Sequence, residues 1–220
     1  MGGTAIFDLD RTLTRSGTWT RFVLRVNGRR PLFWLKLPWF GFLAVAYKLG
    51  LVSRKTVKEY GVSTLRWATR AHLEAMAEAF AADEVPGGLR KQAMSVLSAH
   101  REAGTKLVLA TASAELTAIP IARAMGFDHV IATKLEWDEK DRLTGRLDGE
   151  NCYDEEKLRR VENDVATHGF SHPISFYSDH VSDLPVLLWA DQGIVVNPHA
   201  KLRAAAAKEG LPIVDWDASA

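Results

Sequence analysis

The chain has 220 residues, of which 47% are hydrophobic and 25% charged. This composition excludes a disordered or low-complexity chain, and the length fits one domain, alone or with a sizeable insertion. A single cysteine, Cys152, excludes an internal disulfide framework and a cysteine-rich zinc module. The N-terminus lacks a signal-peptide pattern, and together with the lone thiol this leads us to expect a cytoplasmic protein.

The net charge of +1 conceals two parts of opposite sign. Residues 15–70 hold twelve Lys or Arg and one acid, Glu59, so they carry +11 while the rest of the chain carries −10. This asymmetry indicates two functional surfaces. The basic segment is expected to attract a phosphate-rich partner.

Short apolar runs alternate with helical patterns along most of the chain. Thr4–Phe7 is predicted to be a buried strand, and residues 15–85 then show helical spacing without a strand, with a helix over His72–Ala82. A hairpin is expected from Leu135–Trp137 and Leu143–Leu147. The other predicted strands are Lys106–Ala110, Val130–Ala132, Ile174–Tyr177 and Gly193–Val196. The other predicted helices are Leu89–His100, Glu115–Met125, Glu155–His168, one between the last two strands, and Lys201–Glu209.

Strands that alternate with helices predict a Rossmann-like, doubly wound α/β fold, in which helices cover both faces of a parallel sheet. The helical stretch after the first strand is predicted to be an inserted cap. Residues 1–14 and 86–220 would form the catalytic core, and residues 15–85 the cap. Ligands of such folds bind beyond the carboxyl ends of the strands, so the polar residues there are the candidates for a site.

Two pairs of carboxylates follow predicted strands. The first strand ends in Asp8-Leu9-Asp10, and the alternation of an extended chain turns both carboxylates toward one crevice. Asp179 and Asp183 follow the strand that ends at Tyr177, and Asp179 is expected to face Asp8. Neighbouring carboxylates repel unless a cation lies between them or one is protonated, and Mg²⁺ accepts such ligands. The alternative for the first pair is a loop that caps a helix.

Two further positions indicate an anion site. Thr111-Ala112-Ser113 follows the second long strand, where hydroxyls and free N–H groups at a helix start bind anions, although Ser113 could simply cap the helix. Lys157 lies in the first turn of a predicted helix, where a cation is unfavourable with the helix dipole. This indicates a local anionic partner, and the alternative is a solvated surface lysine.

The order of these residues resembles that of the haloacid dehalogenase-like (HAD) phosphatase superfamily over essentially the whole chain. The matching motifs are Phe7–Thr14, Leu107–Ser113, Asn151–Lys157 and Tyr177–Pro185. The insertion between the first two motifs, and the tail from Val196 to Trp216, resemble the subfamily IB-like branch. That branch includes phosphoserine phosphatase-like and phosphatidylglycerophosphatase C-like proteins.

Three residues depart from the pattern of that family. Ser178 stands where many members have Gly, and His180 stands where a small residue is common, so His180 could change access to a metal. Gly17 lies nine residues after Asp8, where members specific for phosphoserine place a substrate-binding Glu. Its absence argues against phosphoserine as the substrate.

The resemblance implies a phosphomonoester hydrolase that works through an aspartyl-phosphate intermediate. Asp8 would be the nucleophile, and Asp10 would protonate the leaving alcohol and then activate water. The implied cofactor is Mg²⁺, held by Asp8, the backbone carbonyl of Asp10, and Asp179.

The remaining matched residues are implied to handle the phosphoryl group. Thr111, Ala112 and Lys157 would bind its oxygens, where negative charge persists through the transition state, and Lys157 would thereby also be catalytic. Asp183 is implied to orient Lys157 or the metal ligands from outside.

The insertion contains an apolar and aromatic segment, Pro31–Val52, that is too short to span a membrane. Its longest uncharged run, Leu37–Tyr47, has eleven residues, whereas a span needs about 20. One interpretation is an interfacial segment on anionic lipid, because basic residues frame the aromatic side chains. The other is an ordinary cap with an aromatic core and a basic coat. The aromatic residues are Phe33, Trp34, Trp39, Phe40 and Phe42.

The leading expectation is a Mg²⁺-dependent phosphatase of a membrane lipid phosphate, cytoplasmic and peripheral on the cytoplasmic face of the membrane. One alternative keeps the chemistry but uses a soluble ester, such as a phosphoserine-like compound or a sugar phosphate. Another is a membrane-surface binding protein without enzymatic activity. Nucleic acid is not expected, because no recognition motif accompanies the basic residues.

Overall fold

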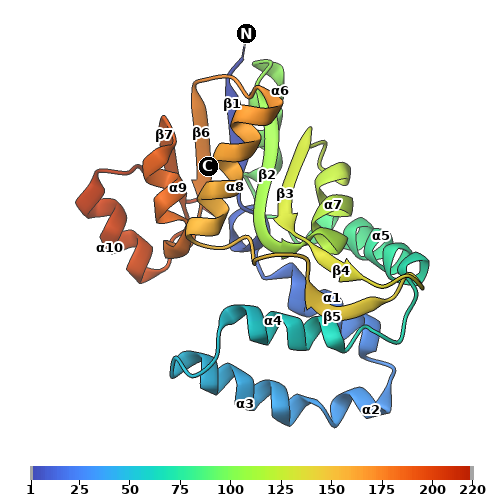
Figure 1. Cartoon of the computed structure of the whole chain (residues 1–220). Helices are drawn as coiled ribbons and strands as arrows, with labels where there is room; N and C mark the ends of the chain where they lie inside the picture. The colour runs from blue at the N-terminus through green and yellow to red at the C-terminus, as the bar shows by residue number, and fades with distance from the viewer. Residues whose placement is uncertain (1, 219–220) are drawn as a thin grey trace.

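The computed structural model describes residues 2–218. Its centre is a six-stranded sheet of order β3-β2-β1-β6-β7-β8, in which every neighbouring pair is parallel (Figure 1). This confirms the Rossmann-like, doubly wound α/β fold. The strands are β1 (Thr4–Phe7), β2 (Lys106–Ala114), β3 (His129–Thr133), β6 (Ile174–Ser178), β7 (Gln192–Val196) and β8 (Ile213–Val214).

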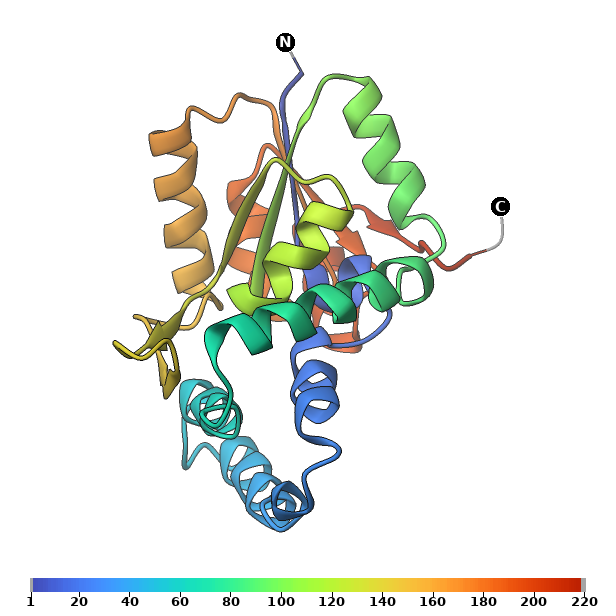
Figure 2. The same ribbon diagram turned by 90° about the vertical axis from the view of Figure 1, so that its right-hand side faces the viewer.

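Successive residues of each strand point to opposite faces of the sheet. Both faces carry apolar side chains, so helices cover both. In β1, Phe7 joins a buried cluster that includes Leu97 of α6 and Ile121 of α7. Its neighbour Ile6 joins the opposite cluster with Val161 of α8. Figure 2 shows α6 and α8 on opposite sides of the sheet. The core helices are α6 (Ala93–Glu102), α7 (Glu115–Ala124), α8 (Glu155–His168), α9 (Leu184–Trp189) and α10 (Ala200–Glu209).

The insertion between β1 and β2 is helical and lies beyond the carboxyl ends of the strands (Figures 1 and 2). A hairpin of β4 (Leu135–Trp137) and β5 (Leu143–Leu147) reaches from the core to α4, where the backbone N–H of Leu147 donates to Glu59 at 3.2 Å. The inserted helices are α1 (Thr18–Asn27), α2 (Pro31–Trp34), α3 (Leu37–Lys48), α4 (Arg54–Ser63) and α5 (Arg70–Gly87).

The structure differs from the sequence prediction at several element ends. Helix α5 continues past residue 85 to Gly87 and packs along α7, so the expected boundary between cap and core falls inside one helix. Strand β2 continues past Ala110 to Ala114, because this stretch still pairs with β3. The helix predicted from Leu89 begins only at Ala93. Strand β8 was not predicted, since two residues carry no periodic pattern.

Helices α2 and α3 leave a large apolar surface exposed. Nine of the fourteen exposed large hydrophobic residues in the described chain lie between positions 32 and 51. We call them the apolar cap surface: Leu32, Trp34, Leu35, Trp39, Phe42, Val45, Tyr47, Leu49 and Leu51. Phe33 is instead buried, and Phe40 packs on Tyr60 with ring centroids 4.6 Å apart. Within residues 2–218, no helix has the length and hydropathy needed to cross a bilayer.

Candidate active site

Two carboxylates meet where β1 and β6 end. Phe7 and Tyr177 are paired in register, so Asp8 and Asp179 leave the sheet side by side, both almost fully buried. The Thr12 hydroxyl lies 3.2 Å from Asp8 Oδ2 and 3.2 Å from Asp179 Oδ1. The two carboxylates therefore share one small space, so the structure brings Asp179 to face Asp8.

Lys157 connects Asp8 to Asp183. Helix α8 starts beside this end of the sheet, and Lys157 in its first turn is buried. Its Nζ donates to Asp8 Oδ1 at 2.9 Å and to Asp183 Oδ2 at 2.8 Å. The side chain is thus not a solvated surface lysine, and its anionic partners are these two carboxylates.

Asp10 lies in the tight turn that follows β1 and is held by three hydrogen bonds. Its Oδ1 accepts from the backbone N–H and the hydroxyl of Thr18, both at 2.7 Å, and its Oδ2 accepts from the Ser113 hydroxyl at 2.6 Å. The next residue, Arg11, has a φ of 68°, which is strained for a non-glycine residue. The strained turn directs Asp10 toward β2 and the start of the cap, and its charge is still near enough to contribute to the raised pKa of Asp8.

The end of β2 contributes Thr111, Ala112 and Ser113. The Thr111 hydroxyl accepts from the backbone N–H of Ser113 at 3.0 Å. The alternative that Ser113 caps the next helix is wrong, because the strand continues to Ala114, which itself precedes α7. Ser113 instead orients Asp10, a contact between residues 103 positions apart.

The cap supplies a residue that the sequence patterns did not single out. Lys58 of α4 donates to the backbone carbonyl of Ala112 and to Oδ1 of Asn151, and lies 3.3 Å from the Thr133 hydroxyl. Burial, followed by the charge of Arg54, lowers the pKa of Lys58 to about 7. Lys58 lies among other basic residues in the sequence, and no local pattern distinguished it as the one that bonds to Ala112 and Asn151.

Charge in the site is dominated by buried carboxylates. Burial is the largest effect on Asp8 and raises the pKa of its carboxyl to about 8, although Lys157 opposes the rise. Burial also raises the pKa of Asp179 to about 6. Burial opposes the charge of Lys157, but Asp183 and Asp8 outweigh it and raise the pKa of the amine. The site therefore holds more negative charge than Lys157 balances.

These residues fit a Mg²⁺ ion. Carboxylate oxygens are its preferred protein ligands, and Asp8 and Asp179 direct one each toward Thr12. Oδ1 of Asp183 is buried and has no hydrogen-bond partner among the described residues, so the site has unused acceptor capacity. A divalent cation would favour the ionised form of Asp8 and of Asp179 and lower both pKa values.

The departures at Ser178 and His180 have local structural roles. Ser178 Oγ donates to Asp183 Oδ2 at 2.6 Å and accepts from the backbone N–H of His180 at 3.2 Å. His180 Nδ1 accepts from the backbone N–H of Ser182 at 3.2 Å. Burial lowers the pKa of His180, which favours the neutral ring that this contact needs. The two residues thereby fix the turn that carries Asp183.

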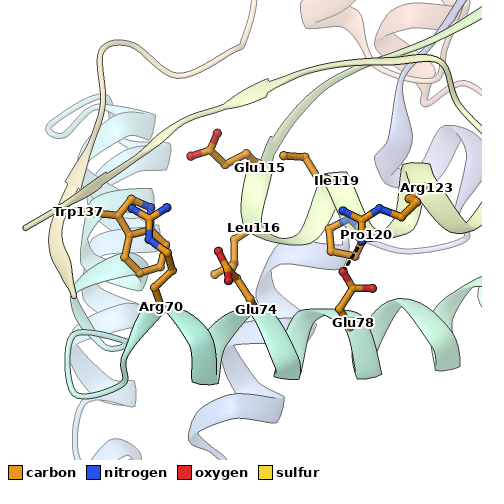
Figure 3. A pocket seen from close by; sticks show the side chains of 9 residues that line it. All are labelled: Arg70, Glu74, Glu78, Glu115, Leu116, Ile119, Pro120, Arg123 and Trp137. Carbon is orange, nitrogen blue, oxygen red and sulfur yellow. Dashed lines mark hydrogen bonds and ion pairs between the residues drawn. The ribbon is translucent and has the colours of Figure 1, made fainter. Parts of the chain in front are cut away.

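A separate cavity of about 410 Å³ lies between α5 and α7 (Figure 3). It is lined by charged side chains, among them Glu78, which pairs with Arg123 at 2.8 Å. Neither Asp8 nor Asp179 lines it. The polar residues at the strand ends, and not this cavity, form the candidate active site.

Comparisons with known proteins show which family the chain belongs to. A family model described as haloacid dehalogenase-like hydrolase matches residues 5–188. Protein CicA of Caulobacter vibrioides is 34% identical over 157 residues, which cover 70% of this chain and 69% of CicA. Phosphoserine phosphatase SerB1 of Mycobacterium tuberculosis is 26% identical over 223 residues, covering 96% of this chain and 70% of SerB1.

A solved structure shares the fold of this chain. The crystal structure of a protein of unknown function from Bordetella pertussis Tohama I has a TM-score of 0.88 at 31% identity and covers 98% of this chain and 99% of that one. The family model, the relatives and the fold together confirm the resemblance drawn from the four motifs. The chain belongs to the haloacid dehalogenase-like hydrolases and is a phosphatase of that superfamily.

Proposed function

We propose that the protein is a Mg²⁺-dependent phosphomonoesterase that forms an aspartyl phosphate on Asp8 and acts on a phosphate group of a membrane lipid. The observation that carries the chemistry is a buried array of charges. Lys157 bonds to Oδ1 of Asp8 at 2.9 Å and to Asp183 at 2.8 Å. Asp179 shares the Thr12 hydroxyl with the other carboxylate oxygen of Asp8. One amine cannot balance the charge of several carboxylates and of a phosphate dianion. The site therefore suits a phosphate substrate that binds together with a divalent cation.

In the first step, Asp8 attacks phosphorus while the bond from phosphorus to the alkoxide oxygen breaks. Asp10 gives its proton to that oxygen, and its three hydrogen bonds to Thr18 and Ser113 fix its direction. The hydroxyl of Thr111, the backbone at Ala112 and the amine of Lys157 hold the phosphoryl oxygens. Bound Mg²⁺ would supply charge neutralisation of the dianion.

In the second step, Asp10 takes a proton from water, which attacks phosphorus and releases Asp8 as a carboxylate. Asp8, the Asp10 carbonyl and Asp179 would hold the metal. Asp183 holds Lys157 in place through its 2.8 Å hydrogen bond and is itself oriented by Ser178. It therefore acts as a positioning residue rather than a catalytic one.

The substrate class is inferred from the cap. Most of the apolar cap surface is more than half exposed, with Leu35 at 76% and Phe42 at 57%. Exposed basic residues flank these helices: Arg29 precedes α2, Lys36 lies in the turn between α2 and α3, and Lys48 ends α3. An apolar face with a basic surround complements an anionic membrane, where the aromatic side chains enter the headgroup region.

The space beside the site also favours a substrate other than phosphoserine. A Cβ placed on Gly17 would meet no atom within 4 Å, so open space lies where phosphoserine-specific relatives are expected to carry a Glu. Lys58 offers positive charge to an anionic headgroup, and Nδ2 of Asn151, which has no hydrogen-bond partner within residues 2–218, offers a donor. If the membrane experiment described below fails, a soluble phosphate ester replaces the lipid as the proposed substrate.

The first prediction concerns the nucleophile. Asp8→Asn should lower turnover of a small aryl phosphate by about a thousandfold or more, because the amide cannot form the covalent intermediate. Asp83→Asn, an exposed change on α5, is the control and should keep wild-type rates. The melting temperature reports whether the fold survives, and substantial turnover by folded Asp8→Asn would rule out the covalent scheme.

The second prediction concerns the metal. Chelation with EDTA should silence the protein, and added Mg²⁺ should restore it. Asp179→Asn should raise the Mg²⁺ concentration needed for half-maximal activity by about tenfold or more, since it removes one anionic ligand. Full activity in a metal-stripped sample would contradict this assignment.

The third prediction uses the lowered pKa of Lys58. Because that pKa is about 7, the side chain is charged at pH 6 and neutral at pH 8, so its attraction for a substrate anion is lost as pH rises. The kcat/KM ratio of wild type to Lys58→Met should therefore fall by about tenfold between pH 6 and pH 8. The ratio cancels the ionisation of the substrate. Lys55→Met, on the same helix, is the control, and a pH-independent Lys58 ratio would refute the role.

The fourth prediction concerns the membrane. Trp39, Phe42 and Leu49 replaced together by Ser should weaken binding to vesicles of phosphatidylcholine with about one third phosphatidylglycerol, and slow hydrolysis of lipid phosphate in them. Hydrolysis of a soluble aryl phosphate should persist, because these side chains lie outside the site. Phe40 is left unchanged, since it packs on Tyr60.

Two comparisons complete that experiment. Leu188→Ser removes an exposed side chain far from the cap in sequence and should leave vesicle binding unchanged. If the wild-type protein fails to sediment with the anionic vesicles at low salt, the lipid assignment is wrong and a soluble phosphate ester replaces it.

A further inference from the structure

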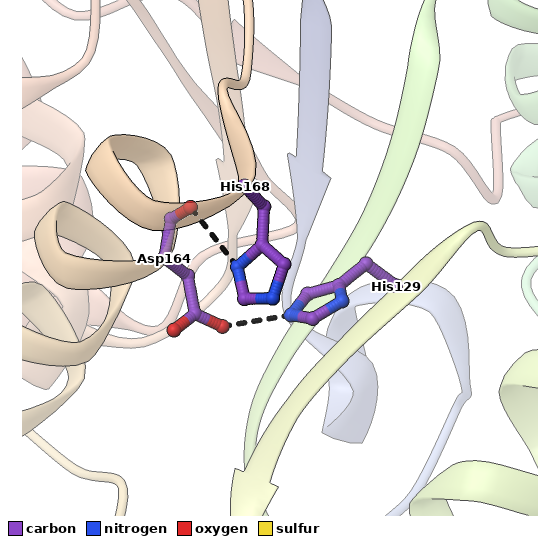
Figure 4. A group of neighbouring side chains, drawn as sticks. All are labelled: His129, Asp164 and His168. Carbon is purple, nitrogen blue, oxygen red and sulfur yellow. Dashed lines mark hydrogen bonds and ion pairs between the residues drawn. The ribbon is translucent and has the colours of Figure 1, made fainter.

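A second cluster of possible metal ligands lies at the opposite end of the sheet from Asp8. Helix α8 begins at the active site with Lys157 and ends at His168, and β3 begins at His129. His129, Asp164 and His168 thus meet near the amino ends of the strands, with their side chains turned toward one another (Figure 4). One potential ligand atom of each lies within 4.8 Å of the others.

The hydrogen bonds of this cluster already direct the ligand atoms. His129 Nε2 lies 2.7 Å from Asp164 Oδ2, and His168 Nδ1 lies 3.3 Å from the backbone carbonyl of Asp164. A carbonyl can only accept, so this contact places the proton of His168 on Nδ1 and leaves the lone pair of Nε2 free. One free imidazole nitrogen, one imidazole N–H and one carboxylate therefore converge.

The rings are also held by packing. Phe170 lies against both imidazoles, with ring centroids 5.4 Å from His129 and 5.8 Å from His168, and the two imidazole centroids are 4.5 Å apart. Support of this kind orients metal-binding histidines before the ion arrives. The cluster borders a surface hollow of about 500 Å³, so an ion can reach it from solvent.

We propose that His129, Asp164 and His168 form a binding site for Zn²⁺ or a chemically similar divalent transition-metal ion, separate from the active site. Two imidazoles and a carboxylate are a donor set that such ions favour over Mg²⁺. Tetrahedral Zn²⁺ needs donor atoms about 3.4 Å apart, so the residues need close by little more than 1 Å. The ion takes the place of the proton between His129 Nε2 and Asp164. In a neutral ring that proton moves to Nδ1, and in an imidazolium ring, which already carries a proton on Nδ1, it is released to solvent.

Neighbouring charges permit this binding. Arg159 and Arg160 line the same hollow, but both bond to Glu156 at 2.7 Å, which offsets one of their two charges, and Asp148 in the same lining adds a second acid. Lys134 also lines the hollow. The Nζ of Lys106 lies over the Phe170 ring, 4.3 Å from its centroid. A bound ion would tie β3 to α8, the helix whose first turn holds Lys157, so occupancy stabilises the support of the active site.

The experiment measures Zn²⁺ binding to the full chain by dialysis and metal analysis, in excess Mg²⁺ so that the active-site carboxylates are occupied. The wild type should retain one equivalent of Zn²⁺, and saturating Zn²⁺ should raise its melting temperature by about 5 to 10 °C. His129→Gln and His168→Gln should each lose the bound ion and the shift. Circular dichroism checks that they are folded, and Co²⁺ absorbance provides a second readout of nitrogen ligands.

The matched control is His172→Gln, because His172 also pairs with an aspartate, Asp191, but without a second histidine. It should bind Zn²⁺ like the wild type. Equal binding by folded His129→Gln and His168→Gln would overturn the proposal, as would a wild type that retains no Zn²⁺. A loss in His172→Gln as large as in the cluster variants would also overturn it, since binding would then be nonspecific.

Discussion

The buried Lys157, bonded at once to Asp8 and Asp183, is the interaction on which the rest of the site depends. Removing one partner of such a buried pair leaves an uncompensated charge, at a cost of about 3–5 kcal/mol. The lysine can hold this place only because α8 starts beside the ends of β1 and β6. The order of the strands is therefore what makes the chemistry possible.

The same group of buried charges favours the binding of a divalent cation together with an anionic substrate. Lys157 offsets only part of the charge of the surrounding carboxylates, and burial raises the pKa of Asp8 to about 8. A divalent ion would return Asp8 to the ionised form that a nucleophile requires. In the proposed mechanism the ion and Lys157 together would neutralise the phosphate dianion, so the three charges would depend on one another.

The cap contacts the candidate active site on its inner side and carries the apolar cap surface on its outer side. Its inner side sends Lys58 to the carbonyl of Ala112 and the amide of Asn151, while α2 and α3 turn Trp39 and Phe42 outward. Burying those rings inside the cap would have produced an ordinary core, as Phe33 does. A contact between α4 and the end of β2 therefore connects the cap that carries the exposed apolar surface with the residues that we propose bind phosphate.

The sequence by itself determined the fold class, the positions of most strands and the candidate residues at their ends, because alternation and helical spacing are local properties. Asp8, Thr111, Lys157 and Asp179 could be selected from motif order. The extension of β2 to Ala114 and the continuation of α5 to Gly87 could not, since pairing with β3 and packing on α7 decide them.

Only the tertiary structure decided which side chains meet across long separations. Lys58 and Asn151 are 93 positions apart, and His129 lies 35 positions from Asp164, so no local pattern links them. Which aromatic residues of Pro31–Val52 are exposed was likewise open. The helices of the cap bury Phe33, half-bury Phe40 and leave Trp34, Trp39 and Phe42 exposed. Contacts of this kind depend on how separate elements pack, which periodicity along one element does not encode.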